Sequence, residues 1–372
     1  MDFLFNEQQT SLGETVAQVL ADAPALVGPE PTREADEATW QALNEIGLFS
    51  LLVPEVHGGV GLPVLDCALA VRALGSGLAP PLVAATLVAS VLIERCGSNW
   101  LKSSVLPRIA TGELRIALAV AEPGNSLDAA KWRCKLNEGR LSGSKIAVVG
   151  GAGANALLVA VWRGGLPLLA YLQTDEPGIS TELHDSLDPS AGLCAVSFDD
   201  VAISDKSILT GAAFDEMIDL AAAFDSEIAM GIAGRMLDIS VAYAKSRVQF
   251  GQPIGAFQAI KHRCADMAVS VEAGQVTADY AFWACAEDPA DQSARASTAK
   301  AYCSEIARDV CRDAIQIHGG MGFTWDLALH RYLRRAKVIE LSLGTPSWHY
   351  DRVLQQTLHG NARLAEMRRD AA

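Results

Sequence analysis

The chain has 372 residues, half of them hydrophobic, and is long enough to bury substantial cores in two or three domains. Its formal net charge is -14 and it has no long Lys/Arg run, which excludes the broad basic surface that nucleic-acid binding needs. No stretch approaches the length of a membrane span, and residues 1–7 do not resemble a secretion signal. We therefore expect a cytoplasmic protein without a nucleic-acid or membrane partner.

The first third of the chain shows helical patterning. Short amphipathic runs are interrupted by helix breakers and turns. These interruptions are Pro24, Pro29, Pro31, the Gly58–Gly61 turn and Pro80–Pro81. The pattern predicts an N-terminal helical domain over residues 1–114.

The hydrophobic pattern of the sequence changes after residue 114. Short apolar or alternating runs, separated by Gly, Asp, Pro and Asn, occur at Leu157–Val161, Leu166–Leu172 and Cys194–Phe198. Runs of this length and spacing are typical of strands. We predict a middle β domain over residues 115–208.

Helical periodicity returns in the last part of the chain and persists. Apolar residues recur at steps of three or four along three segments, 228–243, 260–271 and 302–317. The third segment runs into Gly319 and Gly320, where a helix is expected to stop. We predict a C-terminal four-helix-bundle domain over residues 209–372, and an α+β fold overall.

Cysteine and histidine spacings give no sign of a metal site. The eight cysteines form no CxxC pair, and the seven histidines form no i,i+4 pair around an acid. Buried free thiols and structural histidines are the expected roles, with His318 also placed to contact a nucleotide.

Four segments, in the right order along the chain, resemble the acyl-CoA dehydrogenase family. They are Leu48–Glu55, Glu122–Gly124, Arg247–Gln258 and Gln316–Phe323. The resemblance implies an FAD-dependent oxidoreductase acting on a CH–CH bond, in which a carboxylate removes the α proton of an acyl-CoA while hydride passes to the flavin. It further implies electron-transfer flavoprotein as a partner, and a flavin held between two subunits.

The adenosine and pyrophosphate side of such a site is well represented. Arg247 can supply a fixed multi-donor cation, while aromatic, aliphatic, amide and glycine positions suit a nucleotide. The predicted cofactor-binding residues are Arg247, Gln249, Phe250, Ile254, Phe257, Gln258, Gln316, Gly319 and Gly320. Each alone also fits an ordinary role, such as a surface cation, a core residue or a helix stop.

The catalytic side departs from the family pattern. Leu343 stands where many relatives carry the base, and Ala221 and Ala222 stand where others carry a base and an Arg. Neither residue type can accept a proton. We therefore predict no catalytic residue in this chain and interpret the nearby Asp219, Asp225 and Glu227 as solvated or helix-start charges.

The β domain shows the same loss. The family's Thr-Glu-Pro-Gly-Ala-Gly-Ser-Asp loop is here Ala121–Asp128, and the family's Lys-x-Trp-Ile-Thr-Asn strand is Lys145–Gly150. An aromatic wall has become Ala147 and a hydroxyl donor has become Val149. These substitutions remove contacts to the flavin ring.

The catalytic side of the site departs from the family pattern, whereas the nucleotide side matches it. This difference suggests a base-lacking subunit of an α2β2 acyl-CoA dehydrogenase, such as those of bacterial steroid degradation, in which a homologous partner carries the base. Two alternatives stay open. One is a complete homo-oligomeric enzyme with Asp225, Glu227 or Glu340 as base, and the other is a non-enzymatic scaffold. Lys145 and the cluster Arg331, Arg334, Arg335 and Lys337 are interpreted as a solvated or inter-subunit face.

Overall fold

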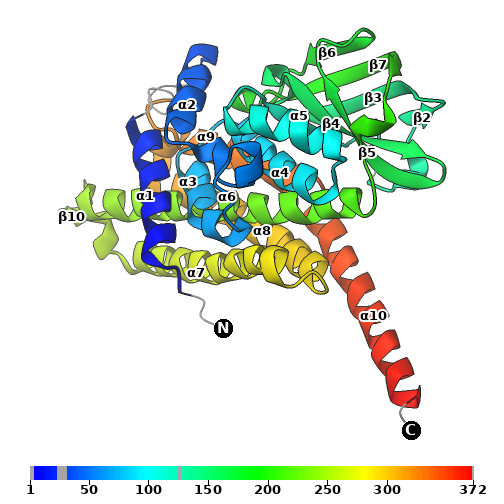
Figure 1. The fold of residues 1–372 in the computed structure, drawn as a ribbon. Helices are drawn as coiled ribbons and strands as arrows, with labels where there is room; N and C mark the ends of the chain where they lie inside the picture. The colour runs from blue at the N-terminus through cyan, green and yellow to red at the C-terminus, as the bar shows by residue number, and fades with distance from the viewer. Residues whose placement is uncertain (1–3, 23–31, 125–126, 371–372) are drawn as a thin grey trace.

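The computed structural model describes residues 4–22, 32–124 and 127–370, with side chains described to residue 358. Pro24, Pro29, Pro31, Asn125 and Ser126 lie outside the described residues. Figure 1 shows the sheet of the middle segment at one end of the molecule, beside the helices that the N-terminal and C-terminal segments form. This arrangement confirms the predicted α+β fold class.

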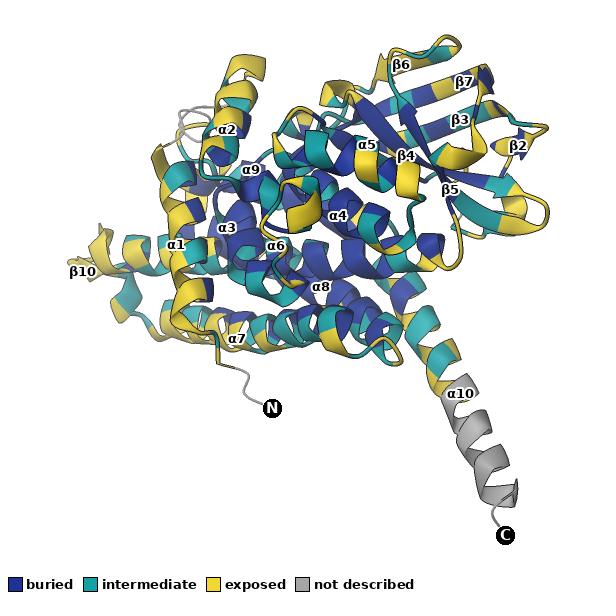
Figure 2. Cartoon of the chain, viewed as in Figure 1, coloured by how far each residue is buried: buried dark blue, intermediate teal, exposed yellow. Residues whose placement is uncertain are grey.

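The N-terminal part is helical. Its helices are α1 (Glu7–Asp22), α2 (Arg33–Glu45), α3 (Ala68–Ser76), α4 (Pro81–Cys96) and α5 (Asn99–Ala110). Thr32 caps α2 by accepting a hydrogen bond from the Ala35 amide, and Pro81 occupies the first position of α4, where its missing N–H costs nothing. Helix α4 is buried along most of its length because it packs between α6 and the sheet (Figure 2).

The middle part forms an eight-stranded sheet of order β6-β7-β3-β2-β4-β5-β8, with β1 added parallel to β4. The strands are β1 (Ile116–Ala119), β2 (Lys135–Asn137), β3 (Arg140–Val148), β4 (Ala156–Arg163), β5 (Leu166–Gln173), β6 (Ile179–Leu183), β7 (Cys194–Ala202) and β8 (Ile208–Leu209). The three predicted strand segments are β4, β5 and β7. Central β4 is an unbroken apolar run because both of its faces are covered, whereas the edge strand β6 is largely exposed.

The C-terminal part is built on one long helix. Its helices are α6 (Ala213–Ser246), α7 (Gln258–Glu287), α8 (Gln292–His318), α9 (Leu329–Leu341) and α10 (Pro346–Asp370), and a short hairpin of β9 (Val248–Gln249) and β10 (Gln252–Pro253) follows α6. Helix α6 contacts α3, α4, α7, α8 and α9. Its predicted apolar face is buried at Ile232 and Met236.

The two ends of α6 have different surroundings. Near its first residues it lies beside the sheet, α4 and α9, whereas its last residue leads into the β9–β10 hairpin at the opposite side of the molecule (Figure 1). Within the described part of the chain, every helix is too short or too polar to cross a bilayer.

Candidate functional site

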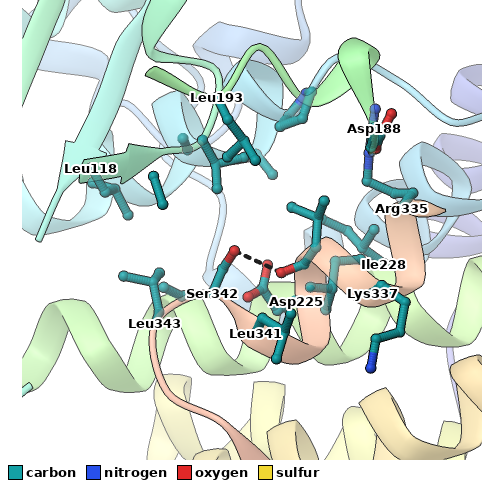
Figure 3. Close-up of a pocket in the computed structure, with 18 of the residues that line it drawn as sticks. Leu118, Asp188, Leu193, Asp225, Ile228, Arg335, Lys337, Leu341, Ser342 and Leu343 are labelled. Carbon is teal, nitrogen blue, oxygen red and sulfur yellow. Dashed lines mark hydrogen bonds and ion pairs between the residues drawn. The ribbon is translucent and has the colours of Figure 1, made fainter. Parts of the chain in front are cut away.

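A cavity of about 560 Å³ lies between the sheet, α4, α6 and α9. Most of its wall is aliphatic. Figure 3 shows Leu118 and Leu193 on one side, and Ser342, Leu343 and Asp225 on the other. The N-terminal, middle and C-terminal parts of the chain therefore meet around one apolar space.

Both positions at which the resemblance predicts a base line this cavity, and both are aliphatic. They are Ala221 on α6 and Leu343 in the turn after α9. Leu343 has φ 52 and is followed by Gly344 at φ 109, a left-handed conformation that a branched aliphatic residue rarely adopts. The backbone at position 343 is thus held in a strained shape although its side chain has no proton-accepting group.

Two positions at which the sequence predicts lost contacts to a flavin ring also lie in the cavity wall. Ala147 and Val149, which replace an aromatic residue and a hydroxyl donor of the family pattern, both line the cavity. Ala147 has φ 49, at a register shift in the pairing of β3 with β7. Like Leu343, it keeps an unusual backbone conformation without a side chain that could contact a ligand through a polar atom.

Asp225 is a carboxylate in the cavity wall. It lies one helical turn beyond Ala221, and its Oδ2 accepts a hydrogen bond from Lys300 Nζ at 2.5 Å. Lys300 is 1% exposed and also donates to the Ile339 carbonyl oxygen. Burial raises the pKa of Asp225, and the Lys300 charge opposes this rise.

The other nearby acids point away from the cavity into ion pairs. Glu227 accepts from Arg72 at 2.8 Å, and burial raises the pKa of Glu227 to about 8. Glu340 is held by Arg308 and Lys337, and Asp219 is buried and paired with Arg352.

The prediction that Asp219, Asp225 and Glu227 are solvated or helix-start charges is therefore wrong. All three belong to α6, which is surrounded by other helices, so Asp219 and Glu227 become buried and Asp225 becomes half-buried. Each is compensated by a cation from a helix distant in sequence.

The basic residues set aside from the sequence are also less exposed than predicted. Arg331 and Arg335 are buried, and Arg335 donates to Asp188 at 3.0 Å and to the Ala79 carbonyl oxygen. Lys145 is fully buried and donates to Glu122 at 2.8 Å. These cations join segments of the fold because α9 and β3 pack inside the molecule, and the interpretation as a solvated face is wrong for them.

The hairpin at the far end of α6 carries several of the predicted cofactor residues. Its two-residue turn, Phe250 and Gly251, has φ 51 and 79. Phe250 is 91% exposed and meets Phe257 edge to face at 6.0 Å between ring centroids. Two features of Phe250 are unfavourable in the isolated chain. A bulky residue rarely adopts a positive φ, and its apolar ring is almost fully exposed to solvent.

The second group of predicted cofactor residues lies beside this hairpin. His318, at the end of α8, stacks on Tyr243 of α6 at 4.2 Å, which brings Gln316, Gly319 and Gly320 close to the end of α6. Gln316 is exposed, and a Cβ added at Gly319 or Gly320 would meet no atom within 4 Å. The backbone there has open space beside it.

All nine predicted cofactor residues lie outside the cavity wall. Five have exposed side chains, Ile254 and Phe257 are half-buried, and the two glycines are open. Arg247 follows Ala221 by 26 residues along and just past α6, or ~39 Å at 1.5 Å per residue. The cavity and the predicted cofactor residues therefore lie at opposite ends of α6.

Sequence reasoning missed several groups that shape the cavity. Lys300, Asp188 and His349 are examples, and His349 donates from Nε2 to the Leu343 carbonyl oxygen at 3.1 Å. Burial, with the nearby Lys300 charge, lowers the pKa of His349 to about 3, so it is neutral. These contacts join residues far apart along the chain, and no local pattern signals them.

Among the described residues no cluster of metal-ligating side chains occurs, and all eight cysteines are free thiols.

Known proteins give a consistent picture. Residues 6–113 match the N-terminal domain model of acyl-CoA dehydrogenases and residues 226–358 match the C-terminal domain model. The chain is 30% identical to the probable acyl-CoA dehydrogenase YngJ of Bacillus subtilis, over 93% of this chain and 96% of that one. It is 33% identical to acyl-CoA dehydrogenase IpdE2 of Mycobacterium tuberculosis, over 89% and 91%.

Solved structures agree in fold across the whole chain. One is the ChsE4–ChsE5 complex of Mycobacterium tuberculosis, with a TM-score of 0.87 and 25% identity over 96% of this chain and 99% of that one. Another is butyryl-CoA dehydrogenase of Megasphaera elsdenii, with a TM-score of 0.86 and 25% identity over 96% and 100%. The chain belongs to the acyl-CoA dehydrogenase family of FAD-dependent oxidoreductases.

Proposed function

We propose that this chain is the base-lacking subunit of a hetero-oligomeric acyl-CoA dehydrogenase. The observation that carries the proposal is that aliphatic Leu343 and Ala221 occupy both base positions, while Arg247 and its neighbours stand exposed at the far end of α6. In the assembly, this chain supplies the adenosine and pyrophosphate half-site, and its partner supplies the carboxylate that removes the α proton. FAD, when bound, would be the hydride acceptor.

The residues at the end of α6 fit half of a dinucleotide. Arg247 is exposed, and among the described residues it has no ion pair, so its guanidinium is available for a pyrophosphate. Gly319 and Gly320 leave room for a ligand against the backbone. Phe250, Phe257 and Ile254 offer apolar surface, and Gln249, Gln258 and Gln316 offer amide groups.

Two structural relatives support a two-chain assembly. The chain resembles a subunit of the ChsE4–ChsE5 complex, and it is 28% identical to a chain of the Tcur3481–Tcur3483 steroid ACAD, with a TM-score of 0.87. By analogy we assign this chain to an α2β2 enzyme acting on a steroid-derived acyl-CoA. Electron-transfer flavoprotein is the expected acceptor of its electrons.

The test is co-expression with a homologous acyl-CoA dehydrogenase subunit that carries the base. The chain purified alone should bind little FAD and lack dehydrogenase activity, whereas the complex should be yellow and active. Arg247→Ala removes a charge-assisted contact of about 1.5–3 kcal/mol, so it should weaken FAD binding by the complex roughly 10- to 100-fold. Arg140→Ala, at an exposed site on β3, is the control and should leave flavin content unchanged.

Two results would count against the proposal. A yellow homo-oligomer whose flavin bleaches on addition of an acyl-CoA would show a complete enzyme. Unaltered flavin content in the Arg247→Ala complex would leave a scaffold of the same fold.

The position of Asp225 favours one alternative, a complete enzyme with a relocated base. Of the acids considered from the sequence, Asp225 lines the cavity, whereas Glu227 and Glu340 are directed into other ion pairs. Its short contact with buried Lys300 argues for a structural role. In the active complex, Asp225→Asn should leave turnover within about twofold if the partner carries the base; loss of turnover with retained flavin would identify Asp225 as the base.

A further inference from the structure

We propose that the outward face of α7 binds a second copy of this chain, with the two α7 helices antiparallel. Helix α7 runs along one side of the molecule (Figure 1), and Figure 2 shows exposed and half-buried residues along its length. The residues of its outward face recur at steps of three or four, as one side of a helix requires. They are His262, Ala265, Val269, Glu272, Val276, Tyr280, Trp283 and Glu287.

This outward face is apolar although α7 already buries another face. Met267 and Val271 on the inner side are buried in the core. On the outer side, Val269 and Val276 are 70% and 61% exposed. A surface helix normally places polar residues opposite its buried face, so an apolar stripe in that position is typical of a contact with another protein.

Large and small side chains occupy opposite halves of the outward face. Tyr280 and Trp283, which stack at 5.6 Å between ring centroids, lie in the C-terminal half, and the exposed Ala265 and Ala268 lie in the N-terminal half. Two copies of α7 aligned antiparallel about Gly274 place Ala265 opposite Trp283 and Ala268 opposite Tyr280, because the members of each pair are equally far from Gly274. Each aromatic ring then faces a side chain small enough to leave room for it.

The charges at the two ends of α7 are complementary in the same alignment. Lys261 and Glu287 are both exposed, and neither has an ion pair within the part of the chain whose side chains the structure describes. They are ~39 Å apart at 1.5 Å per residue, so they cannot pair within one chain. Antiparallel α7 helices place Lys261 of each copy beside Glu287 of the other, whereas parallel helices would bring like charges together.

These pairings identify the occupant as a second copy of the chain. One face supplies both members of every pair, as a surface that contacts itself across a twofold axis must. The contact does not depend on what the hairpin or the cavity binds. Within the proposed α2β2 enzyme it would join the two copies of this chain.

Sedimentation velocity of the isolated chain at low ionic strength tests the proposal, and the wild-type chain should dimerise. Lys261→Glu and Glu287→Lys each create like-charge pairs at both ends of the contact and should weaken association several-fold. An equimolar mixture of these two variants should associate as wild type does, because the mixed dimer has opposite charges at both ends. This rescue is expected of an antiparallel contact between two chains.

The apolar centre of the contact is tested separately. Val269→Glu should weaken association about tenfold or more, because it places a charge in the apolar contact. Val56→Glu, at an 86% exposed valine between α2 and α3, is the matched control and should associate as wild type does. Glu272→Gln should strengthen association several-fold, since the two Glu272 carboxylates lie on either side of the twofold axis.

Four outcomes would each overturn the proposed contact. They are a monomeric wild-type chain, a mixture that associates no better than either charge variant alone, full association of Val269→Glu, and no gain from Glu272→Gln. The isolated dimer should be colourless, which distinguishes it from the yellow homo-oligomer that would count against the proposed subunit role. Flavin content of the co-expressed complex is a separate measurement, so failure of one proposal would not be mistaken for failure of the other.

Discussion

The two ends of α6 show opposite combinations of shape and chemistry. At the cavity end, Leu343 and Ala147 hold strained backbone conformations, φ 52 and 49, but their side chains are aliphatic. At the hairpin end, Phe250 holds a similar conformation, φ 51, and places an aromatic ring almost fully in solvent. Strained backbone conformations therefore occur at both ends of α6, with aliphatic side chains at one end and an exposed aromatic ring at the other.

The difference in burial explains why the two ends can change separately. At the cavity end Ala221 is buried and Leu343 is half-buried against the core, so aliphatic residues at these two positions preserve its packing. The hairpin makes few contacts within the chain, and its exposed groups contribute little to the stability of the isolated subunit. We infer that the groups retained at the hairpin serve binding, whereas those at the cavity serve packing.

The largest effect that tests this comparison concerns the Asp225–Lys300 pair. Asp225→Ala leaves the ammonium of Lys300, which is 1% exposed, without its counter-ion and should destabilise the chain by about 3–5 kcal/mol in urea unfolding. Replacing both, as Asp225→Leu with Lys300→Met, should recover most of that loss. Flavin content of a complex with the double variant should stay normal, and a colourless complex would show that the two ends are coupled.

A second effect lies in the middle of α6 and depends on pH. Burial raises the pKa of Glu227 to about 8, above its ordinary 4.5. The folded chain therefore holds a proton that the unfolded chain releases. The contribution of Glu227 to the free energy of unfolding is present below pH 4.5 and is lost as the pH rises towards 8. The free energy of unfolding falls by up to about 1.4 kcal/mol per pH unit in this range. Glu227→Gln should flatten this slope in urea unfolding between pH 5 and 8, and an unchanged slope would assign it to another group.

Much of the fold could be predicted because its signals are local. The short apolar run at Leu157–Val161 and the helical period from Ile228 to Tyr243 report directly on β4 and α6. The prediction that Leu343 occupies a base position rests on its spacing after the Gly319–Gly320 segment, and it stays a prediction. The structure then places Leu343 in the cavity wall.

The surroundings of the acids could not be predicted in the same way. Asp225 and Lys300 are 75 residues apart, and Arg72 and Glu227 are 155 apart, so only the packing of α3, α6 and α8 brings them together. A charge on a long helix looks solvated in the sequence when its partner lies on another element. The cofactor role of the hairpin stays a prediction, because the groups that would complete it come from another chain.

The smallest effect is at the turn of the hairpin and separates strain from binding. Phe250→Asn introduces a residue that tolerates φ 51, and it loses little burial because Phe250 is 91% exposed. The isolated chain should therefore become more stable by up to about 1 kcal/mol in urea unfolding. In the complex, the same change removes an aromatic contact of about 0.5–1.5 kcal/mol and should weaken FAD binding several-fold. Val276→Asn, at an exposed regular position of α7, should do neither. Unchanged FAD binding after Phe250→Asn would mean that the strained aromatic turn serves no shared cofactor site.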